Sequence, residues 1–159
     1  MSDFDVLLQQ SLTAFTNDAF AKAWWGKERE AVSLFAFGYL IKQCRPDSIF
    51  YDPAQVGIEV RVPKADGLGT KTEICKDLVI WSAPGATIWN KEQWPIAVLE
   101  WKANEPRVSA RDVAWLVAFS AGRPKFTGYA ICLDMEHRNF RLSCTRVRET
   151  TVQRDWLVL

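Results

Sequence analysis

The sequence predicts an α/β protein in which a mixed central β-sheet is flanked by helices. Three observations support this fold class: two segments with helical spacing come first, five strand-like segments bounded by turn formers follow, and a further helical segment separates the third strand from the fourth. The chain has 159 residues, 48% of them hydrophobic, which is enough for one domain with its own core. We therefore expect a single domain over residues 1–159.

Two predicted helices open the chain. Residues 4–21 carry apolar side chains at helical spacing with few helix breakers, and we expect them to form most of an N-terminal helical extension over residues 1–23. Gly26 separates this segment from "KEREAVSLFAFGYLIKQC", which predicts a second helix that ends before Pro46.

Five predicted strands follow, each rich in β-branched or aromatic residues. In chain order they are "VGIEVRVP", "KTEICKDLVIW", "PIAVLEWKA", "FTGYAICLD" and "FRLSCTRVRE". Between the third and the fourth, "SARDVAWLVAFSAG" predicts a helix with Ser109 as N-cap and Asp112 in a capping box, so Asp112 is assigned no chemical role. We expect residues 24–133 to form the core and residues 134–159 to form a C-terminal strand and tail.

Composition and charge argue against several classes of protein. The net charge is +1, so long-range attraction to a polyanion is weak, although the surplus of basic side chains over residues 101–159 leaves room for a local basic surface. No apolar stretch approaches the length of a membrane span, and "MSDFDVLLQQ" has aspartates where a signal peptide has lysines. The four cysteines show no CxxC spacing, which argues against structural zinc and predicts reduced core thiols in a cytoplasmic protein.

Charged residues end the third predicted strand. Side chains alternate between the two faces of a strand, so Glu100 and Lys102 share one face, and the apolar residues before them indicate an interior strand that is covered on both sides. Charges in such a place are costly unless they are paired or bind a metal. Asp77 begins the otherwise apolar run "DLVIW" of the second strand, so it can lie beside Glu100 if the two strands are neighbours.

A third carboxylate comes from the second predicted helix. At about 100° per residue, Glu28 falls among the apolar side chains of Trp24, Val32 and Phe35, whereas Glu30 falls on the opposite, solvated arc. Glu28 is therefore a candidate functional carboxylate. The alternative is that it stabilises the helix dipole at the N-terminus.

Three carboxylates and a lysine at the end of a sheet favour a hard divalent cation such as Mg²⁺ or Mn²⁺. Such an ion can polarise a phosphodiester, and a lysine beside it can orient the attacking water or offset charge on the phosphate. The pattern therefore favours metal-assisted phosphodiester hydrolysis. The simpler alternative for Glu100 and Lys102 is an exposed ion pair at a sheet edge.

Asp77, followed after a loop by Glu100-Trp101-Lys102, resembles the motif of the PD-(D/E)XK nuclease superfamily. The α-β-β-β-α-β core order of that family can be laid over residues 24–133, so the resemblance implies a restriction-endonuclease-like core. It also implies that Asp77, Glu100 and the backbone carbonyl of Trp101 are metal ligands and that Lys102 is the catalytic lysine.

The resemblance extends to the helix before the first strand, with one departure at the second strand. Glu28, in "GKER", matches the helix-borne glutamate of many members and would assist through a metal-bound water. Lys76 stands where the family usually has a proline, and the Pro46-Asp47 dipeptide lies in a loop before the first strand.

Other residues have weaker functional interpretations. Trp89 and Trp94 are candidates for base stacking, although most tryptophans belong to cores, and Lys64 and Lys71 flank a glycine-containing turn where they could touch a nucleic-acid backbone. The single histidine, His137, lies in a polar turn and argues against a Ser-His or Cys-His hydrolase. A solvated sheet edge or a nucleic-acid contact could account for the basic residues Arg138, Arg141, Arg146, Arg148 and Arg154.

The sequence therefore predicts a Mg²⁺- or Mn²⁺-dependent endonuclease acting on DNA, with Asp77, Glu100 and Lys102 at its centre and Glu28 assisting. A chain of this size has little room for a separate recognition domain, so we expect it to act as a homodimer, or to take its specificity from a partner protein or from DNA structure. The alternative is a module of the same fold that binds nucleic acid or acts as a scaffold, with weak or no cleavage.

Overall fold

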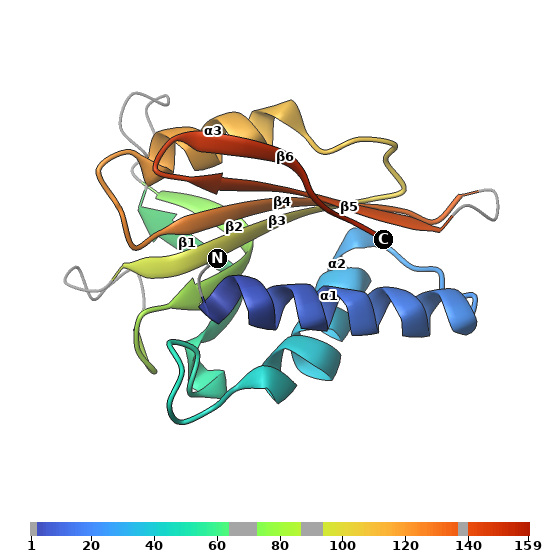
Figure 1. The fold of residues 1–159 in the computed structure, drawn as a ribbon, viewed down its shortest axis with the longest axis horizontal. Coiled ribbons are helices and arrows are strands. Elements are labelled where there is room, and N and C mark those ends of the chain that lie inside the picture. The colour runs from blue at the N-terminus through green and yellow to red at the C-terminus, as the bar shows by residue number, and fades with distance from the viewer. Residues whose placement is uncertain (1–2, 64–72, 87–93, 137–139) are drawn as a thin grey trace.

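The protein is an α/β structure with one mixed β-sheet and helices on both of its faces (Figure 1). The computed structural model describes residues 3–63, 73–86, 94–136 and 140–159. The predicted fold class is confirmed. The order helix, three strands, helix, strand is present from residue 28 to residue 134, as the resemblance implies. The assignment of this core to the restriction-endonuclease fold stays a prediction.

The sheet has six strands in the order β1-β2-β3-β4-β5-β6. β3 and β4 are parallel and every other neighbouring pair is antiparallel. Parallel neighbours need a long crossover, and the helix α3 (Ala110–Ser120) provides it. The strands are β1 (Val56–Pro63), β2 (Glu73–Trp81), β3 (Pro95–Ala103), β4 (Thr127–Asp134), β5 (Arg141–Arg148) and β6 (Thr151–Val158).

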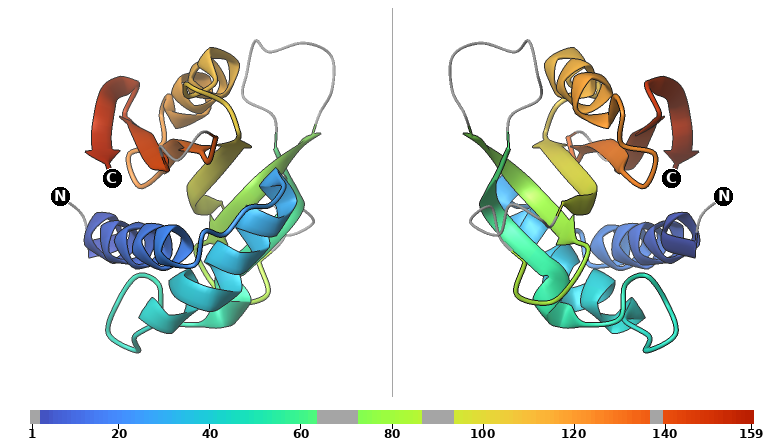
Figure 2. Two further views of the ribbon diagram at one scale, coloured as in Figure 1. Left: turned by 90° about the vertical axis from the view of Figure 1, so that its right-hand side faces the viewer. Right: turned by 90° about the vertical axis from the view of Figure 1, so that its left-hand side faces the viewer.

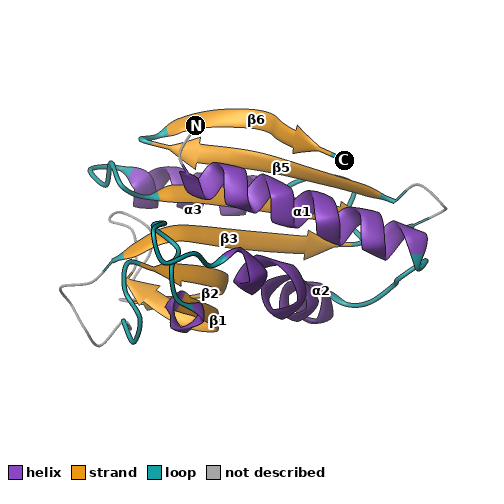
Figure 3. Cartoon of the chain, turned by 60° about the horizontal axis from the view of Figure 1, so that its bottom comes forward, coloured by secondary structure: helices purple, strands orange, loops and turns teal. Residues whose placement is uncertain are grey.

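The helices lie on opposite faces of this sheet. α1 (Asp3–Ala21) and α2 (Glu28–Phe35) cover one face, and α3 (Ala110–Ser120) covers the other (Figure 2). Figure 3 looks onto the face that α1 and α2 cover. The side chain of Ser109 accepts the backbone N–H of Asp112, so the predicted N-cap of α3 is confirmed.

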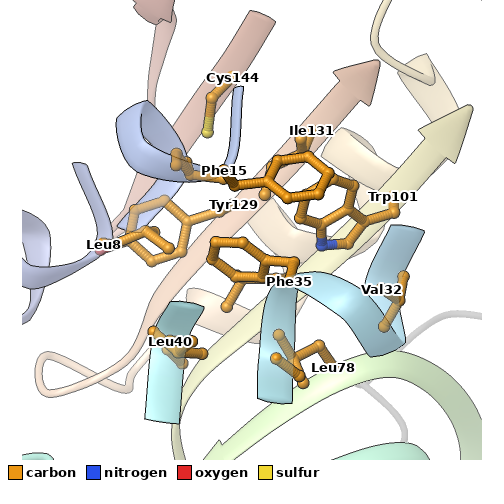
Figure 4. Close-up of a cluster of buried hydrophobic side chains, with 14 of the residues drawn as sticks. Leu8, Phe15, Val32, Phe35, Leu40, Leu78, Trp101, Tyr129, Ile131 and Cys144 are labelled. Atoms are coloured by element: carbon orange, nitrogen blue, oxygen red, sulfur yellow. The ribbon is translucent and has the colours of Figure 1, made fainter. Parts of the chain in front are cut away.

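Each face of the sheet has its own hydrophobic cluster. The larger one lies under α1 and α2 and surrounds Trp101 (Figure 4). The ring centroid of Trp101 lies 5.2 Å from that of Phe35 and 5.9 Å from that of Phe15. The smaller one joins α3 to the sheet through Leu116 and Phe119. β3 contributes to both clusters, with Leu99 on one face and Val98 on the other, so the prediction of an interior strand covered on both sides is confirmed.

Three expectations from the sequence need correction. The C-terminal segment forms two strands, β5 and β6, because the turn at Glu149 and Thr150 folds the chain back onto β5. The second helical segment is not one α-helix: after Phe35 it continues as a π-helical turn (Ala36–Leu40) and a 3₁₀ turn (Ile41–Gln43). Of the four free cysteines, Cys75 is exposed and not part of a core.

β1 and β2 change faces in the middle of each strand. Leu78 and Ile58 belong to the cluster under α1 and α2, whereas Ile74 and Val60 pack against the α3 cluster, although regular alternation would put all four on one face. The pairing register between the two strands is unbroken on both sides of this point. The change falls at Asp77 of β2 and Glu59 of β1, and Glu59 has a positive φ of 50°.

Candidate active site

Four elements bring charged side chains to one end of β3. Glu28 is the first residue of α2, Asp77 lies in β2, Lys102 lies near the end of β3, and Asp112 lies in the first turn of α3. Glu28 is half-buried and Glu30 is exposed, so the helical-wheel distinction between the two carboxylates is confirmed. The cluster forms because α2 and α3 begin on opposite faces of the sheet near the same end of its central strand.

The ammonium group of Lys102 is surrounded by three oxygens from three different elements. Its Nζ donates to the backbone carbonyl of Trp101 at 2.7 Å and to Glu28 Oε2 at 3.3 Å, and it lies 3.8 Å from Asp112 Oδ2. Burial alone would lower the pKa of Lys102, but the neighbouring carboxylates raise it above its ordinary value. Lys102 is therefore a charged group that α2, β3 and α3 hold in place together.

Asp112 is the clearest correction at the site. The capping box predicts only a capping role for it, and its backbone N–H does donate to the side-chain oxygen of Ser109. Its carboxylate, however, forms an ion pair with Lys102, and its charge helps to raise the pKa of both Glu28 and Glu100. The sequence signal for the ion pair with Lys102 was the position of Asp112, at the start of the helix that follows the strand of Glu100 and Lys102.

Asp77 ties β2 to β3 through its side chain. Its Oδ2 accepts the backbone N–H of Trp101 at 2.8 Å, at the point where β2 changes faces. Asp77 also lines a pocket of about 460 Å³, together with Glu28 and Val32 of α2, Ile58 of β1 and Cys75 of β2. The carboxylates of Asp77 and Glu28 therefore border the same pocket, as the sequence interpretation requires.

Glu100 has different surroundings. Its Oε1 accepts from Lys76 Nζ, and both side chains are almost completely buried, with exposed fractions of 5% for Lys76 and 6% for Glu100. Burial raises the pKa of Glu100 to about 7, because it outweighs the opposing effect of Lys76. Asp77 and Glu100 are on neighbouring strands, which meets the condition for them to lie side by side, but Glu100 is paired with Lys76 and not with Asp77.

Lys76 is the functional candidate that the sequence interpretation missed. Regular alternation would place it on the face of Leu78, away from Glu100, and in the family motif it only takes the position of a proline. The change of faces at Asp77 brings Lys76 to the α3 side, where its Nζ lies 3.7 Å from the ring centroid of Trp115. A lysine inside an apolar strand, next to a candidate ligand, was the available signal.

The donor chemistry of the cluster suits a hard cation, although its geometry is organised around lysines. Carboxylate and carbonyl oxygens are the ligands that Mg²⁺ prefers, and Mg²⁺ commonly takes one or two carboxylates and keeps several waters. Asp77, Glu28 and the Trp101 carbonyl offer such oxygens. In the described part of the chain, however, no three histidine, cysteine or acidic side chains are arranged to hold a metal ion.

Three further sets of candidate residues differ in what the structure shows of them. Arg146 donates to Asp5 at 2.8 Å and to Gln153 at 2.9 Å, which joins β5 to α1 and β6 and gives it a structural role. Trp94 is 41% exposed, and its ring packs against Phe119 and the guanidinium group of Arg123, so a stacking role stays a prediction. Several candidates lie outside the described residues: Lys64, Lys71, Trp89, His137 and Arg138.

Comparisons with family models, with curated proteins and with solved structures find no match to this chain. Within the described ranges, no helix is long and apolar enough to cross a membrane.

Proposed function

We propose that the protein is a metal-dependent nuclease that hydrolyses phosphodiester bonds, most simply in DNA. The observation that carries this proposal is the position of Lys102. Its ammonium group is held by the Trp101 carbonyl, Glu28 and Asp112, and Asp77 bonds to the backbone N–H of the same Trp101. A charged lysine fixed among carboxylates, next to an open pocket, suits a reaction in which negative charge builds up on a phosphate.

Each residue of the cluster has a role in this proposal. Asp77, Glu100 and the Trp101 carbonyl would hold a Mg²⁺ or Mn²⁺ ion, and Glu28 would bind it through a water molecule. A bound divalent cation supplies a more acidic water and neutralises charge on the phosphate. Lys102 would orient the attacking water or donate a hydrogen bond to the phosphate oxygen, and Asp112 would keep Lys102 charged and in position.

The nucleic-acid substrate is part of the same proposal. A net charge of +1 gives little long-range attraction, so binding would depend on local basic residues and on a second copy of the chain or a partner protein. Arg29 lies on the pocket wall, and its side chain is 80% exposed, so its ion pair with Glu59 leaves it able to contact a phosphate.

A second candidate function is supported by the Lys76–Glu100 pair. A buried lysine already neutralises Glu100, and a carboxylate in such a pair is a poorer metal ligand. The same fold could then bind nucleic acid or act as a scaffold with weak or no cleavage.

A cleavage assay distinguishes the two functions. Supercoiled plasmid, single-stranded DNA and RNA would each be incubated with the protein in Mg²⁺ and in Mn²⁺. We expect cleavage that falls by about 100-fold or more in Lys102→Met and in Glu28→Gln, because each change removes a charged group from the reacting centre.

Glu30→Gln is the matched control. Glu30 lies in the same turn of α2 as Glu28 but is exposed, and it contacts the backbone N–H of Lys27, which a glutamine oxygen can still accept. Cleavage should therefore be unchanged in Glu30→Gln. Folded protein that binds DNA but cleaves no substrate in either metal would favour the binding module.

A further inference from the structure

The Lys76–Glu100 pair is the one ion pair in the described part of the chain whose two side chains are both almost fully buried. Arg146 and Asp5 come closest to it, but the Arg146 side chain keeps one fifth of its surface exposed. Burying two charges is costly, and an isolated pair is often no more stable than apolar residues of the same volume. The pair is therefore a candidate for a role other than holding the fold together.

Lys76 has two sources of stabilisation at this position. One is the carboxylate of Glu100, and the other is the face of the Trp115 ring, 3.7 Å from Nζ, on α3. A cation over an aromatic ring is attracted to it, and more strongly when water is excluded. Trp115 is itself 5% exposed, so Lys76 is enclosed between β3 and α3.

The change of faces at Asp77 determines this arrangement. It lets two consecutive residues of β2 act on opposite sides: Asp77 borders the pocket under α2, while Lys76 reaches Glu100 under α3. β2 thus supplies the Asp77 carboxylate to the proposed cation site. It also supplies the Lys76 ammonium group, which pairs with Glu100, the second proposed ligand of that site. The two groups have opposite effects on the binding of a divalent cation.

We propose that Lys76 is a built-in counter-ion that competes with the divalent cation for Glu100. For Glu100 to act as a ligand, Lys76 must leave both the carboxylate and the Trp115 ring, so Lys76 sets the cation concentration at which the site fills. The inference rests on the proposed function in one respect, which is that Glu100 is a cation ligand.

Substituting Lys76 by methionine tests this directly. Methionine keeps most of the side-chain length and can still pack on Trp115, but it removes the charge. Binding of Mn²⁺ and Mg²⁺ would be measured by calorimetry for wild type, Lys76→Met and Lys76→Met/Glu100→Gln. We expect Lys76→Met to bind Mn²⁺ about tenfold more tightly or better, because a like charge next to a ligand opposes cation binding. The double variant should lose this gain.

A second variant covers the case in which Lys76→Met does not fold, since it leaves Glu100 buried without a partner. Trp115→Phe keeps an aromatic ring of weaker attraction for cations and removes an indole N–H that is buried with no hydrogen-bond partner among the described residues. The affinity for Mn²⁺ should rise in Trp115→Phe as well, by a smaller factor.

The outcomes separate this inference from the proposed function. Tighter Mn²⁺ binding that depends on Glu100 supports the counter-ion role, even if no variant cleaves DNA and the nuclease proposal fails. Unchanged Mn²⁺ affinity in both folded single variants overturns the counter-ion role, even if the wild type cleaves DNA through Lys102 and the nuclease proposal stands.

Discussion

Glu100 and Lys102 are two residues apart on β3, yet each has its own partners of opposite charge. Lys102 is partly exposed and contacts carboxylates from α2 and α3, whereas Glu100 is buried against Lys76. The ammonium group of Lys102 is therefore accessible to a substrate. The carboxylate of Glu100 lies in a place where water cannot stabilise its charge.

The pKa of Glu100 gives a prediction about stability. Burial raises this pKa from an ordinary value of 4.5 to about 7, so the folded protein binds the Glu100 proton more tightly than the unfolded chain does. Stability linked to this proton is present below about pH 4.5 and is lost as the pH rises to about 7. We expect the free energy of unfolding of the wild type to fall over this range relative to that of Glu100→Gln.

Urea unfolding of the two proteins between pH 4.5 and pH 7 would measure this difference. Glu100→Gln keeps the shape of the side chain and has no proton to lose, so it serves as the reference. Parallel pH profiles for the two proteins would contradict the prediction.

At the residue scale, periodicity in the sequence identified Glu28 as the half-buried carboxylate and Glu30 as the exposed one, and the structure confirms both. Two sequence patterns did not reveal a site residue: strand alternation did not reveal the position of Lys76, and the capping pattern did not reveal the ion pair of Asp112. Period-2 alternation assumes a regular strand, and a face change cannot be seen in that pattern. A capping interaction of the backbone, in turn, says nothing about where the Asp112 carboxylate points.

At the scale of the element, the change of faces in β1 and β2 has a backbone origin. Glu59 adopts a φ of 50°, a conformation that costs a side-chain-bearing residue about 1–2 kcal/mol. Its carboxylate pairs with Arg29, but these side chains are 39% and 80% exposed, so the ion pair contributes little. The conformation is therefore maintained by packing on both faces of the strand pair.

This predicts that Glu59→Gly is tolerated. Glycine adopts positive φ without steric cost, so the free energy of unfolding should be unchanged or rise by about 1 kcal/mol, even though the unfolded chain gains flexibility. Glu59→Val should lower the free energy of unfolding by about 1–3 kcal/mol, because a β-branched residue is strained there.

Glu59→Gln removes the ion pair alone and is the reference for Glu59→Gly and Glu59→Val. Thermal unfolding of the three variants gives the comparison, and a Glu59→Gly protein less stable than Glu59→Gln would contradict it.

Most elements could be predicted from the sequence because their patterns are strong. β3 coincides with the predicted "PIAVLEWKA", and α3 begins after its predicted N-cap, Ser109. β6 was missed because most of its residues are exposed and carry no apolar alternation, as expected of an edge strand. The π-helical turn was missed because it spans only five residues, Ala36–Leu40, which is too short for a change in apolar spacing to be visible in the sequence.

At the scale of the whole molecule, the site depends on the order of the strands. β3 is central, with β2 antiparallel on one side and β4 parallel on the other, and α3, the crossover to β4, begins one short loop after β3 and therefore near the end of that strand. α2 reaches the same end from the opposite face. Helices from both faces thus meet around Lys102, and this arrangement depends on topology, which a motif of a few residues does not specify.

If these residues form a site for a divalent cation, Mn²⁺ binding must depend on Asp77, and calorimetry of wild type and Asp77→Asn measures this dependence. Asparagine can still accept the backbone N–H of Trp101, so the β2–β3 contact is kept while the charge is removed. We expect saturable Mn²⁺ binding by the wild type that is lost in a folded Asp77→Asn protein. Equal binding by the two proteins, or no binding by either, would contradict it.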